Sequence, residues 1–402
     1  MATFISSLIV GLAIVVGIPT FIFFVEVLAA IILPIRASGP NIAKRPRVAV
    51  LIPAHNESRW ILPTLGDIRP ELIQGDRLLV VADNCTDDTA AIAGGAGAEV
   101  LVRHDAERVG KGYALDWGVR HLSTAPPDVL VVVDADCRVS RGAIDVLATT
   151  CAVTSRPAQA LYLVSAPSET AINYQVAEFA SRVKNFVRPL GFAALQLPCQ
   201  LMGTGMAFPF DLIRSAELAS GQIVEDLKLG LDLAQLGKPA VFCPRAIVTS
   251  SFPVSISAAK TQRQRWEHGH MSIILSTVPH LLYVSLVRRN LSLVALALDV
   301  LVPPLTFLGM LLFATVILAV LGEVIGHSAA ALAISLGNLG AFITAVVLAW
   351  WCYGRDILPL RKIGSVASFI IGKIPLYRGF LMHRRESEWV RTERKNVDPK
   401  NP

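Results

Sequence analysis

The feature that most constrains how this chain can fold is a long apolar run, residues 4–35, which contains no lysine or arginine. A helix of about 20 apolar residues crosses the hydrocarbon core of a bilayer, so this run is long enough to span. A cleaved secretory signal would begin with a positive residue and would have a shorter apolar core. We therefore predict an uncleaved transmembrane helix within residues 1–36.

Two further apolar runs, residues 300–322 and 328–354, lie toward the other end of the chain. Each is long enough to span a bilayer. The first run includes the pair Pro303–Pro304, and only a short turn with Glu323 separates the two runs. We predict two transmembrane helices within residues 291–354.

Two regions beside these runs have an intermediate character. Residues 271–287 are apolar but too short and too interrupted to span, which predicts an interfacial helix over residues 271–290. Residues 355–402 mix apolar and basic residues, which predicts an interfacial or cytoplasmic tail. For the segment from residue 364 onward, an amphipathic helix packed on the soluble domain is the alternative.

Basic residues flank the predicted spans, and such residues prefer the cytoplasmic side of a membrane. Their positions predict that the N-terminus and the Glu323 turn lie outside, while the middle of the chain lies in the cytoplasm. The expected location is a bacterial inner or plasma membrane. The basic residues that carry this argument are Arg36, Lys44, Arg45, Arg47, Arg288, Arg289, Arg355, Arg361 and Lys362.

The composition agrees with a protein that is partly embedded in a membrane. Of the 402 residues, 53% are hydrophobic and only 17% are charged, which excludes a disordered chain. The net charge of +6 is a small excess that basic residues beside membrane spans explain, so no nucleic-acid partner is expected. The six cysteines form no C-x-x-C pair, so they indicate neither a zinc ribbon nor a thioredoxin-type redox site.

Glu26 lies inside the first predicted span, where a carboxylate is expensive in lipid. A functional interpretation is a contact with another helix or with a lipid acceptor. The alternative is a carboxyl group that lies close to the membrane interface or carries a proton. The sequence leaves these interpretations open.

Residues 46–270 have the character of a soluble α/β domain. Helical patterns such as Ser58–Leu65 and Lys111–Leu122 alternate with short runs rich in valine, leucine and isoleucine. Such runs fit strands that are covered on both faces, and the alternation favours a mostly parallel sheet. The predicted strands are Arg47–Pro53, Arg77–Ala82, Glu99–Arg103 and Val129–Asp134.

The triplet Asp134–Ala135–Asp136 ends the last of these strands, at the edge of the sheet where ligands bind in open α/β folds. Two carboxylates spaced i and i+2 in a turn can both contact one hard cation. A divalent ion held there could neutralise the charge of a departing diphosphate. The triplet also occurs by chance, and a solvated acidic turn is the alternative.

Polar residues end two other predicted strands. Pro53, His55 and Glu57 follow the first strand, and Asp83 ends the second. Because the carboxyl ends of parallel strands gather at one edge, these side chains are expected near the acidic triplet. Helix capping is an alternative role for Asn56 and Asp83, and it is compatible with ligand binding.

Lys111 stands between two glycines at the start of a predicted helix, where it could contact an anionic ligand. Residues Arg108–Gly112 resemble a shortened phosphate-binding loop. The complete P-loop pattern is absent, which argues against a P-loop NTPase. A simple transition from loop to helix is the alternative.

Two patterns further along could serve a transfer reaction. Glu225 and Asp226 begin a predicted helix, where a carboxylate could act as a general base or could only complement the helix dipole. Gln262, Arg265 and Trp266 are spaced i, i+3 and i+4 and share one helix face. Arginine suits a diphosphate and tryptophan suits the apolar face of a sugar. A basic surface helix near lipid is the alternative.

Taken together and in this order, these patterns resemble those of family 2 glycosyltransferases. More narrowly, they resemble the membrane-bound branch that includes cellulose, chitin and hyaluronan synthases. The resemblance covers residues 46–270 and the layout of the flanking spans. It implies a GT-A fold, which is a Rossmann-like α/β domain with a mostly parallel sheet. It also implies an inverting, metal-dependent transfer from a nucleotide-diphosphate sugar.

The resemblance implies a role on the donor side for each matching residue. The base and ribose of the nucleotide would contact one set, and the diphosphate would lie near another. Asp136, together with Asp134, would hold Mg²⁺ or Mn²⁺. The first set is Pro53, His55, Glu57 and Asp83, and the second is Lys111, Asp134 and Arg265.

On the acceptor side, Asp226 matches the last residue of the family's T-E-D pattern and would be the catalytic base, with Glu225 beside it. Val224 replaces the threonine of that pattern. The turn Gly203–Thr204–Gly205 resembles a loop that shapes the acceptor pocket. Gln262 and Trp266 would contact the acceptor.

We predict a non-processive enzyme that adds one sugar, with a UDP-sugar as the favoured donor. Its acceptor would be a lipid-linked molecule or a glycan at the cytoplasmic membrane face, in exopolysaccharide or glycolipid synthesis. Other expected contacts are membrane lipid and, as an open alternative, a homo-oligomer or a polysaccharide-assembly complex. The enzyme is predicted to be non-processive because only three spans are counted, whereas processive synthases of this branch carry more.

Several rival functions stay open. One is a processive synthase of a β-linked polysaccharide, whose channel would form by oligomerisation. Another is a polyprenyl-phosphate sugar synthase, which usually lacks the Gln262–Trp266 pattern. A sugar nucleotidyltransferase would have a glycine-rich loop near the first strand, which residues Pro53–Glu57 do not provide. A membrane scaffold with a degenerate transferase domain fits poorly with the intact carboxylates.

Overall fold

The computed structural model describes residues 2–34, 44–167, 172–219, 224–324, 329–362 and 364–382. The described residues divide into two compact units. We call residues 44–167 and 198–266 the sheet unit. We call residues 2–34, 172–197 and 267–382 the helical unit.

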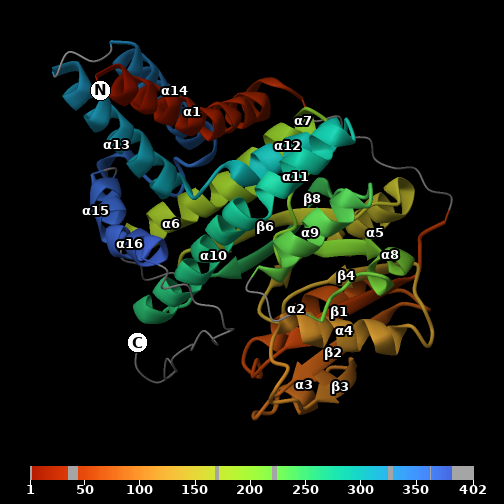
Figure 1. Ribbon diagram of the computed structural model, residues 1–402. Helices are drawn as coiled ribbons and strands as arrows, with labels where there is room; N and C mark the ends of the chain where they lie inside the picture. The colour runs from red at the N-terminus through yellow and green to blue at the C-terminus, as the bar shows by residue number, and fades with distance from the viewer. Residues whose placement is uncertain are drawn as a thin grey trace. The chain divides into compact units, whose positions relative to one another are not determined.

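The sheet unit contains an eight-stranded mixed sheet with the order β3-β2-β1-β4-β7-β6-β8-β5. Strands β3, β2, β1 and β4 run parallel, and Figure 1 shows β1, β2 and β3 together at one end of the sheet. Strand β7 is antiparallel to both β4 and β6, and β5 is antiparallel to β8. The strands are Val48–Ala54 (β1), Arg77–Asp83 (β2), Glu99–Arg103 (β3), Val129–Val132 (β4), Arg138–Val139 (β5), Ala158–Ser165 (β6), Met206–Pro209 (β7) and Val241–Ser251 (β8).

Helices cover both faces of this sheet, because alternate residues of each strand point to opposite faces. On one face, α2, α3 and α5 pack over buried residues such as Val50 and Val80. On the other face, α4 approaches β1 so closely that a Cβ at Gly118 would lie 2.5 Å from Leu51. The helices of this unit are Ile61–Ile68 (α2), the 3-10 turn Arg69–Glu71 (η1), Thr89–Gly95 (α3), Lys111–Leu122 (α4), Ala143–Thr154 (α5), Phe210–Arg214 (α8), Glu225–Gln235 (α9) and the start of Ile256–Ser276 (α10).

The predicted α/β class is therefore confirmed, with small differences at the element ends. The other four strands, β5, β6, β7 and β8, were not predicted. Helix α2 begins at Ile61 rather than Ser58, because this start puts Pro63 in the first turn, where its missing N–H is not needed. Strand β4 ends at Val132, so both aspartates of the triplet lie in the turn that follows.

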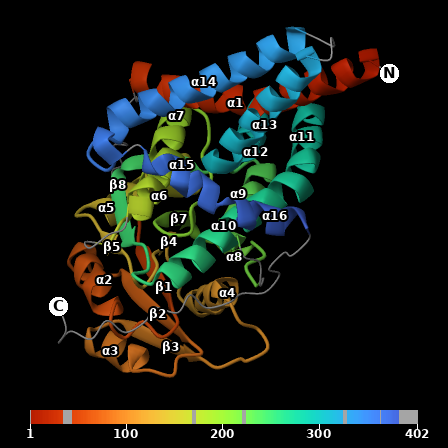
Figure 2. The ribbon, with the colours of Figure 1, turned by 90° about the vertical axis from the view of Figure 1, so that its left-hand side faces the viewer.

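The helical unit contains three helices that are long and apolar enough to cross a membrane. They are Ala2–Ile32 (α1), Leu305–Val324 (α13) and Ala329–Tyr353 (α14). A fourth candidate is the pair formed by α10 and Val278–Val287 (α11), which is bent by 44°. Figures 1 and 2 show α1, α13 and α14 side by side.

Helices α1 and α14 run in the same direction. The side chain of Asn338 donates to the carbonyl of Ala13 at 2.8 Å, and the hydroxyl of Tyr353 donates to the carbonyl of Ala30 at 2.8 Å. Both pairs advance together along the two helices. The C-terminal ends of α1 and α14 therefore lie on the same side of the helical unit.

The shorter helices differ from the predicted layout in two places. Residues 271–290 do not form one helix, since α10 ends at Ser276 and α11 follows it. The pair Pro303–Pro304 lies between helices rather than inside a span. The remaining helices are Ile172–Arg182 (α6), the π-helix Val183–Val187 (η2), Arg188–Ala194 (α7), Leu291–Leu301 (α12), the 3-10 turn Leu360–Lys362 (η3), Ser365–Gly372 (α15) and Ile374–Leu381 (α16). The predicted tail beyond residue 382 lies outside the described residues.

Glu26 contacts other helices of the helical unit, which answers one question that the sequence left open. Arg188 donates to the Glu26 carboxylate at 2.6 Å and to the Asp299 carboxylate at 2.5 Å. All three residues are buried. A Cβ at Gly191 would overlap the backbone carbonyl of Glu26, so α7 crosses α1 in direct backbone contact there.

Candidate active site

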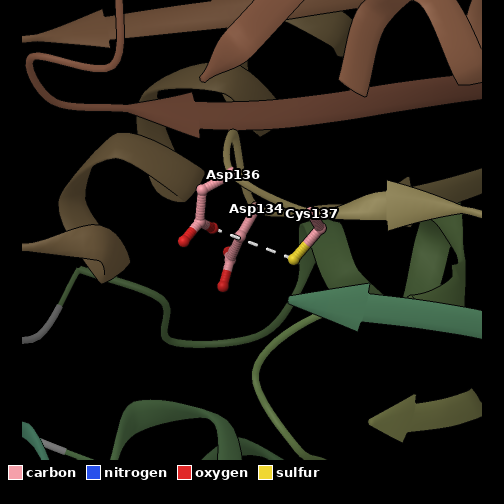
Figure 3. A group of neighbouring side chains, drawn as sticks. All are labelled: Asp134, Asp136 and Cys137. Carbon is pink, nitrogen blue, oxygen red and sulfur yellow. Dashed lines mark hydrogen bonds between the residues drawn. The ribbon is translucent and has the colours of Figure 1, made fainter. Parts of the chain in front are cut away.

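The turn after β4 brings two carboxylates and a thiol together. Ligand atoms of Asp134, Asp136 and Cys137 all lie within 4.8 Å of one another. Figure 3 shows the three side chains pointing toward a common space. The thiol of Cys137 is buried and lies 3.8 Å from Asp136 Oδ1. Oxygen donors of this kind suit a hard divalent cation.

A buried hydroxyl on α2 contacts the backbone of this acidic turn. Thr64 Oγ1 lies 2.8 Å from the carbonyl oxygen of Ala135 and 2.6 Å from that of Cys137. A buried hydroxyl without such partners would be costly, so the contact fixes the path of the turn. Neither Thr64 nor Cys137 was predicted as a site residue, because an isolated threonine or cysteine carries no pattern.

Lys111 lies at the first position of α4 and faces the acidic turn. Its ammonium group donates to Asp134 Oδ1 and, at 2.6 Å, to the carbonyl oxygen of Gly203. Burial acts to lower the pKa of Lys111, but the charges of Asp134, Glu225 and Asp226 outweigh it, and the net shift is upward. Lys111 therefore keeps its positive charge at neutral pH.

Asp134 and Asp136 stand in different surroundings. Burial raises the pKa of Asp134, and the ammonium of Lys111 offsets part of that rise. The same ammonium occupies one carboxylate oxygen of Asp134. Asp136 lies in the same cluster and stays the predicted principal ligand of a metal ion.

The two carboxylates predicted to serve as or beside the catalytic base, Glu225 and Asp226, begin α9. Burial, together with the nearby charge of Asp226, raises the pKa of Glu225 to about 7, although Lys111 offsets part of the effect. A Cβ at Gly203 would lie 3.4 Å from Asp226 Oδ2, so the backbone of Gly203 lies beside that carboxylate. Gly203 therefore contacts Lys111 through its carbonyl and lies beside the carboxylate of Asp226.

A pocket of about 640 Å³, counting the part open to solvent, adjoins this group. It lies between α4 and α9 and has both charged and apolar walls. Its lining residues include Lys111, Leu115, Met206, Glu225, Asp226 and Leu229.

The predicted turn Gly203–Thr204–Gly205 is a tightly held loop. Gly203 and Gly205 both have positive φ, at 88° and 62°, which favours glycine. A Cβ at Gly205 would lie 2.7 Å from that of Ala160. Thr204 is fully buried, and its Oγ1 accepts a hydrogen bond from the backbone N–H of Asp134 at 3.0 Å.

The residues predicted for the nucleotide lie at the ends of β1 and β2. Pro53 is in β1, and His55 Nδ1 lies 2.7 Å from the carbonyl oxygen of Asp83. The backbone N–H of Glu57 donates to Thr89 at 2.8 Å. Asp83 is buried and forms an ion pair with Arg103 at 2.6 Å.

Helix capping, the alternative role for Asn56 and Asp83, is wrong. The N-cap residues of α2 and α3 are Trp60 and Asp88. Asn56 instead accepts a hydrogen bond from the backbone of Thr86 at 2.7 Å, which ties together the loops after β1 and β2. The partner of Asp83, Arg103, was not predicted. The signal was weak, because an arginine at a strand end has many ordinary roles.

Gln262, Arg265 and Trp266 all lie on α10, as predicted, and each is partly buried. The contacts described above join Asp134, Lys111, Gly203, Thr204 and Asp226 into one group. The placement of the α10 residues relative to that group stays a prediction.

An α/β sheet with an acidic turn after β4, a facing lysine and a second acidic pair at a helix start defines a transferase domain of the GT-A kind. Residues 46–269 match the family model described as "Glycosyltransferase like family 2". This match covers more than half of the 402 residues, so the chain belongs to that family.

Similar proteins agree with this assignment. A glucosyl-3-phosphoglycerate synthase of Mycobacterium tuberculosis is 38% identical over 96 residues, which are 22% of this chain and 28% of the synthase. An uncharacterised glycosyltransferase of Mycobacterium bovis is 38% identical over 95 residues, 24% of this chain and 39% of that protein. The chain thus matches well under half the length of these relatives.

A solved structure shares the fold over most of the chain. It is a mannosyltransferase from Pyrobaculum calidifontis in complex with GDP-Man and Mn²⁺, with a TM-score of 0.53. The likeness covers 96% of this chain and 100% of that one at 17% sequence identity. At this identity it supports the fold alone.

Proposed function

We propose that this protein is an inverting, metal-dependent glycosyltransferase of the membrane-bound branch. It moves one sugar from a nucleotide-diphosphate sugar, with UDP favoured, to a lipid-linked or glycan acceptor. The reaction takes place at the cytoplasmic face of the membrane, in exopolysaccharide or glycolipid synthesis.

One observation carries the proposal. Lys111 contacts both Asp134 and the carbonyl of Gly203, whose backbone lies beside Asp226. A cation for the diphosphate, carboxylates for a metal and a carboxylate for the acceptor thus surround a single loop. Inverting transfer needs the base on one face of the anomeric carbon, and the groups that neutralise the diphosphate on the opposite face.

The acidic turn fits a divalent metal ion. Asp136 would be the principal ligand and Asp134 a second one, with the Cys137 thiol close by. A bound Mg²⁺ or Mn²⁺ would neutralise the charge that develops on the leaving diphosphate. The Mn²⁺ bound by the structurally similar mannosyltransferase supports this choice of cofactor.

The protein's own residues would then perform the rest. Lys111, held charged, binds a diphosphate oxygen, and Arg265 adds a second positive group. Asp226 accepts the proton of the acceptor hydroxyl. The hydroxyl oxygen bonds to the anomeric carbon as the bond from that carbon to the diphosphate breaks. The bonding electrons leave with the diphosphate.

The course of the helices supports the predicted orientation in the membrane. Because α1 and α14 run in the same direction, their C-terminal ends share one side, and basic residues Arg36 and Arg355 follow these ends. Arg355 also stacks 4.3 Å over the ring of Trp351, a pairing that suits a membrane interface. We therefore place this side in the cytoplasm and the N-terminus outside.

The donor and the product length have specific alternatives. A GDP-sugar is the alternative donor to a UDP-sugar, because the similar mannosyltransferase binds GDP-Man. A processive polysaccharide synthase is the second candidate function, because the bent pair α10 and α11 raises the number of candidate spans to four.

The test is a product analysis. The protein would be purified in detergent with native lipid extract and Mn²⁺ or Mg²⁺, and offered a panel of radiolabelled UDP- and GDP-sugars. A single sugar recovered in the organic phase is the expected product and identifies the donor. A long polymer would replace the single-addition proposal by the processive one. No label transfer from any donor would count against the whole assignment.

A further inference from the structure

A buried glutamine on β6 contacts the loop at residues 202–204, which in turn contacts Lys111 and lies beside Asp226. Gln159 is fully buried. Its Nε2 donates to the carbonyl oxygens of Thr204 and Ala160, both at 2.9 Å. Its Oε1 accepts from the backbone N–H of Met202 at 2.8 Å. Both ends of the amide are therefore occupied, and two of its contacts hold the backbone of residues 202–204 against β6.

That loop contacts several members of the group described above. The hydroxyl of Thr204 accepts from the backbone of Asp134, and the carbonyl of Gly203 accepts from Lys111. The backbone of Gly203 also lies beside Asp226. A shift of residues 202–204 would therefore move Lys111 and change the space next to Asp226.

The acidic turn has a separate support. Thr64, on α2, holds the carbonyls of Ala135 and Cys137. Gln159 and Thr64 are thus different buried supports from different elements of the sheet unit, while Thr204 Oγ1 links the loop to the turn through the Asp134 N–H and the Cys137 thiol. Loss of one support would leave the other in place.

We propose that Gln159 is a positioning residue for sugar transfer: it sets the loop at residues 202–204, and through that loop the spacing of Lys111 and Asp226. Thr64 has the corresponding role for the metal-binding turn. The inference rests on the proposed roles of Asp136 as metal ligand and Asp226 as base. It assigns Gln159 to the chemical step and Thr64 to metal and donor binding.

Three variants of the full-length protein separate these roles. Gln159→Met keeps the length of the side chain but loses its polar contacts, and Gln159→Asn is a milder variant that withdraws the amide by one methylene. Thr64→Val keeps the shape and loses the hydroxyl. Leu161→Ala is the matched control, since Leu161 is buried on the same strand and offers no hydrogen bond to the loop.

The first measurement is hydrogen exchange in the free protein, which needs no donor and no metal. In Gln159→Met, peptides that cover residues 200–206 should exchange faster, while those that cover residues 135–139 stay near wild type. Thr64→Val should give the reverse pattern. Equal changes in both peptides, or none at residues 200–206 in Gln159→Met, would overturn the inference.

The second measurement compares turnover with binding. Gln159→Met should lower kcat by about 10- to 100-fold, the usual effect of a supporting hydrogen-bond residue, and should keep the Kd for UDP with Mn²⁺ within about threefold. Thr64→Val should weaken Mn²⁺-dependent UDP binding by about 10-fold. A parallel loss of kcat and affinity that tracks the lowered Tm, as expected for Leu161→Ala, would mean that Gln159 is only structural. Wild-type protein that fails to bind any nucleotide would instead sink the proposed function, and hydrogen exchange would still decide the inference.

Discussion

Lys111 donates a hydrogen bond to the carboxylate of Asp134, and it does so from the first position of α4 while also contacting the carbonyl of Gly203. The lysine thus joins a turn after β4 to a loop before β7, two segments that are far apart in the sequence. A positive charge held in this way between a metal-type turn and a catalytic carboxylate is poised to bind an oxyanion.

We expect Lys111→Met to lower kcat/KM for the sugar donor by about 10- to 100-fold, because a hydrogen bond to a charged group is worth about 1.5–3 kcal/mol. Steady-state kinetics with varied donor measures it. Lys228→Met is the matched control, since Lys228 lines the same pocket but pairs with Asp232. Similar losses in the two variants would contradict a specific role for Lys111.

Asp226→Asn should reduce kcat by about 10²- to 10⁴-fold, the range of general base catalysis, and should leave nucleotide binding within about threefold. The base acts after the donor has bound, so the two effects separate. Single-turnover kinetics and calorimetric titration with UDP measure them. Asp232→Asn is the control, because Asp232 is a second carboxylate on α9 that lines the same pocket. An equal loss of affinity and rate in Asp226→Asn would refute the base assignment.

Asp136→Ala should abolish Mn²⁺-dependent nucleotide binding, and EDTA should do the same to the wild-type protein, because Asp136 is the proposed principal ligand of the metal ion. Binding of fluorescent UDP with and without Mn²⁺ reports this directly. Re-addition of Mn²⁺ should restore binding to the EDTA-treated wild type and not to the variant. Full turnover in EDTA would remove the metal from the mechanism.

Glu225→Gln should raise the Tm more at pH 8 than at pH 5. Burial and Asp226 raise the pKa of Glu225 from 4.5 to about 7, so between these values the folded protein holds a proton that the unfolded chain releases. The free energy of unfolding therefore falls as the pH rises through this window. Glutamine removes the penalty, and each kcal/mol recovered is worth about 2–4 °C.

The measurement for Glu225 is a set of thermal melts from pH 5 to pH 8. Glu217→Gln is the control, because it removes one exposed carboxylate from the rim of the same pocket. A difference in Tm between Glu225→Gln and the wild type that is flat across this range would show that the proton on Glu225 does not contribute to stability.

Arg188→Met should lower the Tm by on the order of 10 °C, because it leaves two buried carboxylates without their cation, at a cost of about 3–5 kcal/mol. The double variant Arg188→Met, Glu26→Gln should recover part of the loss. Arg182→Met is the control, since its partner Asp356 is exposed and surface pairs contribute little. Thermal unfolding in detergent measures all three, and a Tm for Arg188→Met equal to that of the control would contradict the argument.

The sequence predicts the parallel half of the sheet, strands β1 to β4, and its ligand edge, because the signals are local. The four predicted strands are all present, and α4 has the predicted bounds, since Lys111 is the first residue after a glycine in an extended turn. Pro63 marks the start of α2, but the pattern of apolar residues alone allowed an earlier start. The antiparallel strand β7 was missed because Met206–Pro209 is too short to stand out from the loops around it.

The supporting residues could not be predicted, because their roles come from the tertiary fold. Gln159 and Thr64 are single polar residues in apolar elements, and only the closed sheet shows which carbonyls they reach. Arg188 could not be predicted either: an arginine at the start of a helix looks like a surface residue until Glu26 and Asp299 are found beside it. Long-range pairs of this kind leave no periodic trace in a sequence.

The order of synthesis gives the Glu26–Arg188 pair a further meaning. Glu26 precedes its partner by 162 residues, so at about 5–20 residues per second the ribosome needs on the order of 10–30 s to deliver Arg188 after Glu26. During that interval α1, if it spans the membrane as proposed, holds its carboxyl group without a cation. A carboxyl group can enter lipid as a neutral acid by taking up a proton, whereas a guanidinium stays charged. Glu26, which can be neutralised, thus lies in α1, which is made before α7. Arg188, which stays charged, is made only after its carboxylate partner on α1 is present.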